Sequence, residues 1–334
     1  MKTMRLIFGL IFLVSMAASC QNSTPDPGKP SQPGQPTSGY GGSGYQHAEV
    51  IKKNYDDGPT GYWLYLPASP APVSAPVIVF NHGYGGWNPA NYGAWIKHLV
   101  RQGNIVIYPR YQKDARTKPA EFTPNAAAGI KRALQVLASG ELKIKAGTDQ
   151  LVIIGHSYGG VVTANLALNA AELGIPQPKG IFLAAAGVGP VPSGQAKSYA
   201  GLPASLKLLM IIEKQDTMVD SVFMKKVYAE SKAISASNKN LLMHYPDGYG
   251  NDSITAGHNE PTCADLDFDS KDGKLAASPE VDATDYYCYW RLADALIDCS
   301  RNNKGCPTAF TETKEQTFMG KWSDGVEIKR LTGR

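Results

Sequence analysis

Five short, mostly apolar runs constrain the fold of this 334-residue chain more than any other feature. Runs of this kind are typical of strands that are covered on both faces of a sheet. They occupy residues 76–80, 104–108, 151–154, 180–186 and 206–212. Helix start and stop signals separate several of them, from Asn88-Pro89 to Gly103, from Thr123-Pro124 to Gly140 and from Gly159 to Gly174. This alternation predicts an α/β fold with a mostly parallel sheet and helices on both faces.

The N-terminal residues indicate export. Lys2 and Arg5 precede an apolar run that ends in Ala17-Ala18-Ser19-Cys20, which is typical of a signal peptide over residues 1–19. The small residues before Cys20 are similar to a bacterial lipobox, although Ala17 stands where Leu or Val is usual. We expect a lipoprotein whose acyl chains at Cys20 tether it to a membrane surface, facing the periplasm or the exterior. Secretion without the lipid is the alternative.

Composition divides the rest of the chain into a spacer and one domain. Between residues 21 and 46, 15 of 26 residues are Pro, Gly or Ser, so we expect a flexible spacer over residues 20–46. Residues 47–334 suffice for a single domain, with a short C-terminal extension from about residue 301. A half-buried strand is expected over residues 62–67, paired with residues 47–55.

Charge gives little sign of a nucleic-acid partner. The formal net charge is +4, and loss of Lys2 and Arg5 with the signal leaves 4 − 2 = +2. The acidic run Asp265–Gly273 is read as a solvated loop. A calcium loop is not favoured because Ser270 stands where Gly is needed and no Glu occupies the last position.

The sequence GHSYGG places Ser157 directly after the apolar run 151–154, between Gly155 and Gly159. A sharp turn from strand to helix strains the serine backbone, exposes its hydroxyl and leaves no room for larger neighbours. The helix N-terminus that follows favours developing negative charge. A tight structural turn would have the same composition, but the strand before the motif and the helix after it favour a nucleophile.

With this context, the chain resembles α/β-hydrolases of the serine-esterase kind, near the dienelactone hydrolase, cutinase and chlorophyllase-like branches. The resemblance covers nearly all of residues 47–300. It implies the α/β-hydrolase fold, a catalytic triad in the chain order Ser, acid, His, and no cofactor.

The resemblance also implies which residues complete the triad. His258, in the loop beyond the expected last strand, is favoured as the base over His244, which lies within that strand. Asp216 matches the position of the acid. Asp220, the main rival, stands where a helix cap is expected, and Glu213 comes too early.

Two backbone N–H groups are expected to form the oxyanion hole. One belongs to Tyr158, and the other to Tyr84 in the sequence NHGYGG, which is similar to the family's oxyanion turn. No metal is expected, because His82 and His156 flank motif glycines and no second ligand motif accompanies them. Four aromatic residues follow the turn, and packing of the first helix and lining of a substrate pocket are equally open roles for them: Tyr84, Trp87, Tyr92 and Trp95.

These residues predict an exported serine hydrolase that cleaves carboxylic esters through an acyl-enzyme. Only about twenty residues separate the runs 180–186 and 206–212, too few for a helical lid. We therefore expect an open cleft for short-chain or polymer-borne esters. Acyl transfer or amide cleavage by the same triad is an alternative, and a non-catalytic surface-binding module is a weaker one.

With Cys20 set aside, four cysteines are available for disulfides in an exported chain. Cys288 and Cys299 fall on one predicted helix about 16 Å apart, whereas disulfide Cα atoms lie within about 7 Å of each other. A turn brings Cys306 back onto Cys299. We therefore expect Cys299–Cys306 and, by elimination, Cys263–Cys288, which would tie the His258 loop to the last helix.

Overall fold

The computed structural model describes residue 26 and residues 28–191, 193–265 and 280–333. The predicted signal peptide, Cys20 and most of the acidic run 265–273 lie outside the described residues. Within the described part of the chain, no helix combines the length and apolar character that a membrane crossing requires.

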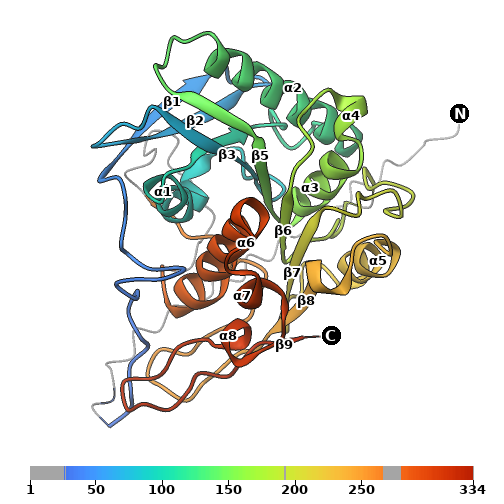
Figure 1. The fold of residues 1–334 in the computed structure, drawn as a ribbon. Coiled ribbons are helices and arrows are strands. Elements are labelled where there is room, and N and C mark those ends of the chain that lie inside the picture. The colour runs from blue at the N-terminus through green and yellow to red at the C-terminus, as the bar shows by residue number, and fades with distance from the viewer. Residues whose placement is uncertain (1–25, 27, 192, 266–279, 334) are drawn as a thin grey trace, which may run out of the picture.

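A sheet of nine strands forms the centre of the molecule, in the order β1-β2-β4-β3-β5-β6-β7-β8-β9 (Figure 1). Its strands are β1 (Glu49–Tyr55), β2 (Tyr62–Ala68), β3 (Ser74–Asn81), β4 (Ile105–Pro109), β5 (Lys145–His156), β6 (Gly180–Ala184), β7 (Lys207–Glu213), β8 (Lys239–His244) and β9 (Thr332–Gly333). The six strands from β4 to β8 in this order are parallel, and β1, β2 and β9 are antiparallel at the edges. The predicted mostly parallel sheet is confirmed.

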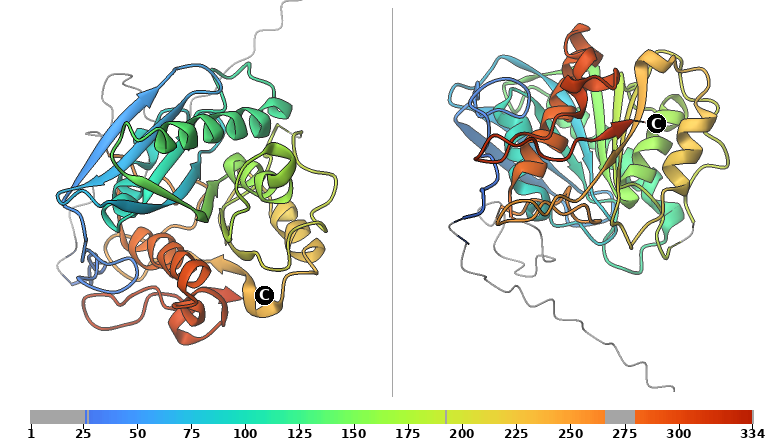
Figure 2. Two further views of the ribbon diagram at one scale, coloured as in Figure 1. Left: turned by 45° about the horizontal axis from the view of Figure 1, so that its top comes forward. Right: turned by 90° about the horizontal axis from the view of Figure 1, so that it is seen from below.

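Helices cover both faces of the sheet because the central strands are apolar on both faces. In β3, Val77 and Val79 pack into one core while Ile78 and Phe80 pack into the other. The first core is closed by α2 (Pro119–Ala138), α3 (Tyr158–Leu168), α4 (Ala170–Leu173) and α5 (Val222–Glu230). The second lies under η1 (Pro89–Tyr92), α1 (Gly93–Arg101), the π-helical turn η4 (Asp285–Trp290) and α6 (Arg291–Asn302). Figure 2 shows the sheet between these two layers.

The start of the second predicted helix differs from expectation. We expected a helix from Thr123-Pro124, but α2 begins at Pro119 and contains Pro124. Proline is well suited to the first helical position, where its missing N–H would have no helical partner. The earlier start places Phe122 in the core against Tyr158.

The segment before β1 is packed against the domain, so the predicted flexible spacer is wrong for residues 28–46. The hydroxyl of Tyr40 donates to Asp298 on α6 at 2.7 Å, and the N–H of Gly41 donates to Asp294 at 2.8 Å. Gly41 allows the backbone to approach η4 and the start of α6 closely, since a Cβ at this position would collide with the carbonyl of Tyr286 and lie 3.1 Å from the backbone nitrogen of Arg291. Composition therefore indicated a lack of apolar side chains, not a lack of contacts.

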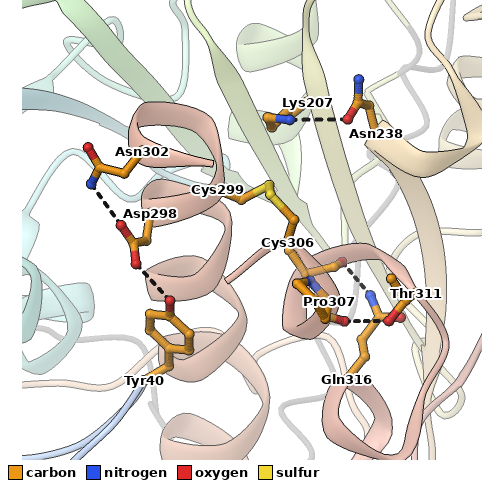
Figure 3. The surroundings of a disulfide bond; sticks show 11 residues. Tyr40, Lys207, Asn238, Asp298, Cys299, Asn302, Cys306, Pro307, Thr311 and Gln316 are labelled. Carbon is orange, nitrogen blue, oxygen red and sulfur yellow. Dashed lines mark hydrogen bonds between the residues drawn. A yellow bond between two sulfur atoms is a disulfide. The ribbon is translucent and has the colours of Figure 1, made fainter. Parts of the chain in front are cut away.

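The last thirty residues belong to the same fold. They form α7 (Cys306–Phe310), α8 (Lys314–Thr317) and β9, and bury Phe310, Met319 and Trp322 in the second core. A disulfide joins Cys299 at the end of α6 to Cys306, with a Cα–Cα distance of 4.8 Å (Figure 3). This is the first of the two predicted bonds.

The second predicted disulfide is wrong, because Cys263 and Cys288 are both free and buried. The loop that carries Cys263 is bound to η1 and α1. The N–H of Cys263 donates to the carbonyl of Asn91, and the Cys263 sulfur accepts the N–H of Trp95 at 3.2 Å. The Cys263 thiol faces Asp285 in η4, one turn before Cys288. Elimination failed because it assumed that every cysteine is paired.

Candidate active site

Ser157 lies between the C-terminal end of β5 and the first turn of α3, near the middle of the sheet. Its backbone has φ 54° and ψ −124°, a strained conformation for a residue with a side chain. The flanking glycines are needed for close packing: a Cβ on Gly155 would collide with Thr163, and one on Gly159 with the carbonyls of Asn81 and His82. The turn therefore fixes the serine hydroxyl at the edge of the sheet where the parallel strands end.

Two side chains from later loops form a chain of hydrogen bonds with Ser157. His258, in the loop after β8, has its Nε2 atom 2.8 Å from Ser157 Oγ and its Nδ1 atom 2.7 Å from Asp216 Oδ2. Asp216 follows β7, and its other carboxylate oxygen accepts the N–H groups of Met218 and Val219. Burial acts to raise the pKa of Asp216, but the hydrogen bonds from His258 and the two N–H groups outweigh it and lower the pKa below its ordinary value. The carboxylate is therefore held ionised beside the imidazole.

The rival residues have other contacts. Asp220 accepts the N–H of Val222, the first residue of α5, and lies one residue before Ser221, the N-cap of that helix. Glu213 and His244, at the ends of β7 and β8, form a fully buried pair with 2.6 Å between Oε2 and Nδ1. The hydroxyl of Tyr289 also donates to Glu213. These groups lie in the core under the His258 loop and do not reach Ser157.

A pocket of about 260 Å³ opens over Ser157. The residues Gly83–Gly86 and Tyr158 line one part of it, and residues 187–191 line another. In the described part of the chain, the N–H groups of Tyr84 and Tyr158 donate to no protein acceptor. Both expected oxyanion donors therefore lie at the pocket with their N–H groups free to bind a ligand oxygen.

The walls of the pocket are largely apolar. Tyr84 and Met218 are 42% and 57% exposed, and Val188, Val191 and Val219 complete the lining. Of the aromatic residues after the oxyanion turn, Tyr84 and Tyr92 contact the pocket while Trp95 is part of the core. The described residues between β6 and β7 form no helix, so no helical lid arises from this connection.

Two contacts that hold the pocket together could not be predicted from the sequence motifs. The hydroxyl of Tyr92 accepts the N–H of Gly83 in the oxyanion turn. The ring of His156 forms a hydrogen bond with the backbone carbonyl of His258. His156 lies inside the motif, so its position was visible, but nothing in the sequence indicates its partner 102 residues away. Among the described residues, no group of three or more His, Cys, Asp or Glu side chains is arranged to hold a metal ion.

Comparison with known families agrees with this geometry. The model of the chlorophyllase family matches residues 46–209, which include the sheet from β1 to β6, the oxyanion turn and Ser157. This family is part of the α/β-hydrolase superfamily, and the chain has the fold of that superfamily. The match ends before Asp216 and His258, so the hydrogen bonds from Ser157 to His258 and from His258 to Asp216 rest on the structure alone. No curated protein matches the chain. For this α/β-hydrolase, the family match indicates hydrolysis of esters.

Proposed function

We propose that this α/β-hydrolase is a serine hydrolase that cleaves carboxylic esters through an acyl-enzyme. Ser157 attacks the ester carbonyl, and His258 accepts the serine proton and then donates it to the leaving alcohol. Asp216 orients the imidazole, and the N–H groups of Tyr84 and Tyr158 stabilise the oxyanion. Water, activated by His258, then releases the acid. The continuous Ser157–His258–Asp216 hydrogen-bond chain carries this proposal.

A fluorophosphonate probe tests the nucleophile. The protein should become covalently labelled on Ser157 and hydrolyse p-nitrophenyl butyrate, and Ser157→Ala should lose labelling and about 10³-fold or more of the activity. Ser139→Ala, which alters an exposed hydroxyl at the end of α2, is the matched control. Intact hydrolysis by Ser157→Ala would refute the proposal.

The substrate class follows from the pocket. Its apolar walls, and the lack of a helix among the described residues between β6 and β7, favour short-chain or polymer-borne esters that enter from solvent. An ester panel of increasing acyl length, with and without polymeric esters, measures this preference. A jump in rate when a long-chain ester passes its solubility limit would contradict it, since that behaviour is typical of a lidded lipase.

We further propose that the protein is exported and anchored through a lipid on Cys20. The Cys299–Cys306 bond supports export, because disulfides persist mainly in oxidising compartments. The mass of the mature N-terminal peptide should show diacylglycerol on Cys20, and Cys20→Ala should release the protein from membranes. A mature chain that lacks Cys20 would contradict the anchor.

A further inference from the structure

Three hydrogen bonds, two buried and one partly buried, connect the oxyanion turn to the His258 loop. The N–H of Gly83 lies 2.8 Å from the hydroxyl oxygen of Tyr92. That oxygen lies 2.8 Å from Nδ1 of His156, and Nε2 of His156 lies 2.8 Å from the carbonyl oxygen of His258. Tyr92 and His156 are 2% and 3% exposed, so water does not substitute for these bonds.

The two ends of this chain fix the direction of its outer bonds, and a neutral His156 ring fixes the direction of the middle one. A backbone N–H only donates and a carbonyl oxygen only accepts. Gly83 therefore donates to Tyr92, Tyr92 donates to Nδ1 of His156, and Nε2–H of His156 donates to His258. This requires neutral His156 with its proton on Nε2. Burial, followed by the nearby His258 charge, lowers the pKa of His156 to about 3, which keeps the ring neutral.

This chain of hydrogen bonds passes close to Ser157. Gly83 directly precedes Tyr84, whose N–H is the proposed oxyanion donor, and His258 is the proposed base. A Cβ added to Gly83 would lie 3.2 Å from Ser157 Cβ, 3.2 Å from Tyr92 Oη and 3.3 Å from His156 Nδ1. The oxyanion turn, the residue before the nucleophile and the base loop thus meet at one point, although they come from distant parts of the sequence.

We propose that Tyr92 and His156 are positioning residues that hold the oxyanion turn and the His258 loop at a fixed separation around Ser157. The inference rests on the proposed serine hydrolase function. Neither side chain exchanges a proton with the substrate. Both act through backbone atoms, Tyr92 through Gly83 and His156 through His258, so that oxyanion donor and base are in place together when the transition state forms.

Tyr92→Phe tests the link, because it removes the hydroxyl and keeps the ring. Tyr199→Phe is a closely matched control. The Tyr199 hydroxyl is also buried, accepts one N–H, from Ala196, and donates to one side-chain atom, Oδ1 of Asn165. Both variants should lose similar thermal stability. Only Tyr92→Phe should lower kcat, by tenfold or more on the scale of a roughly 1 Å misplacement, with KM within about twofold of the wild type.

His156 supplies a second test. A glutamine amide carries one acceptor and one donor side by side, as neutral imidazole does, whereas leucine has neither. His156→Gln should therefore retain clearly more kcat than His156→Leu. Equal kcat values for these two variants would show that the ring only fills space and would overturn the inference.

The rate of fluorophosphonate labelling separates the two proposals. If the wild-type protein is not labelled, the proposed function itself fails. If the wild type is labelled, Tyr92→Phe should react more slowly than Tyr199→Phe. Labelling of Tyr92→Phe at the wild-type rate, or equal loss of kcat in both tyrosine variants, would overturn the positioning role while leaving the nucleophile intact.

Discussion

Asp216 approaches His258 with one carboxylate oxygen, at 2.7 Å from Nδ1, while its other oxygen accepts two backbone N–H groups. The carboxylate is therefore fixed in orientation before it meets the imidazole. It holds the proton on Nδ1, which leaves Nε2 as an acceptor for the Ser157 hydroxyl. Asp220, four residues later, accepts the N–H of Val222 at the start of α5.

The two aspartates should consequently respond differently to the same substitution. Asp216→Asn should lower kcat by roughly 10³- to 10⁴-fold, because an amide can donate to Nδ1 and favour the wrong tautomer. Asp220→Asn should keep near wild-type kcat and lose at most about 1 kcal/mol of stability, since the side-chain oxygen of asparagine can also accept the N–H of Val222. Steady-state kinetics with p-nitrophenyl butyrate measure both. A larger loss of kcat for Asp220→Asn than for Asp216→Asn would identify Asp220 as the acid of the triad.

The sequence predicted the parts of the molecule that depend on local pattern. Buried strands and the sharp turn at Ser157 follow from short-range signals, whereas Asp216 and His258 were assigned through the family resemblance. The structure joins these three residues in one chain of hydrogen bonds. Contacts between distant segments were not predictable. The Tyr92–His156 bond leaves no trace in spacing or composition.

Two errors have the same physical origin. Composition indicated a flexible segment before residue 47, but polar side chains and backbone groups bind it to α6 without a hydrophobic core of its own. Cysteine parity indicated a Cys263–Cys288 bond, but packing directs the Cys263 thiol toward Trp95 and Asp285. In both cases tertiary contacts determined the outcome.

Stability should depend on pH through the buried Glu213–His244 pair. Burial acts to lower the pKa of His244, but the Glu213 charge and hydrogen bond outweigh it, so the pKa lies above the ordinary 6.5. A histidine whose pKa is raised on folding stabilises fully below 6.5 and loses this contribution as pH rises through the folded-state pKa. The free energy of unfolding of the wild type should therefore exceed that of Glu213→Gln most at pH 6, by about 3 kcal/mol.

Urea unfolding between pH 6 and pH 8 measures this difference, which should narrow as pH rises. Glu49→Gln is the control, because Glu49 is exposed and, among the described residues, its carboxylate accepts a hydrogen bond only from the Ser69 hydroxyl. Its difference from the wild type should stay constant over the same range. A Glu213→Gln difference that widens with pH would contradict the assigned charge state of His244.

The segment before β1 should contribute to stability but not to catalysis. Tyr40→Phe removes the half-buried bond to Asp298 and should lower the free energy of unfolding by about 1–3 kcal/mol, the range for a hydrogen bond to a charged group. Tyr249→Phe removes a similar bond to Asp324 at a site that is 48% exposed, and should cost less than about 0.5 kcal/mol. Equal losses in chemical denaturation would show that the segment is not bound in solution.

Cys263 and Cys288 should remain thiols in the folded protein. Both are fully buried, and burial raises the pKa of each thiol, which suppresses the thiolate that reacts with disulfides and with thiol reagents. A chain shortened to begin at Gln21 should show almost no rapid reaction with a thiol reagent while folded. In guanidinium without reductant it should expose two thiols, and four after reduction. Two thiols before reduction, assigned by peptide mapping to Cys263 and Cys288, fit the single Cys299–Cys306 bond, whereas a peptide joining Cys263 to Cys288 would contradict it.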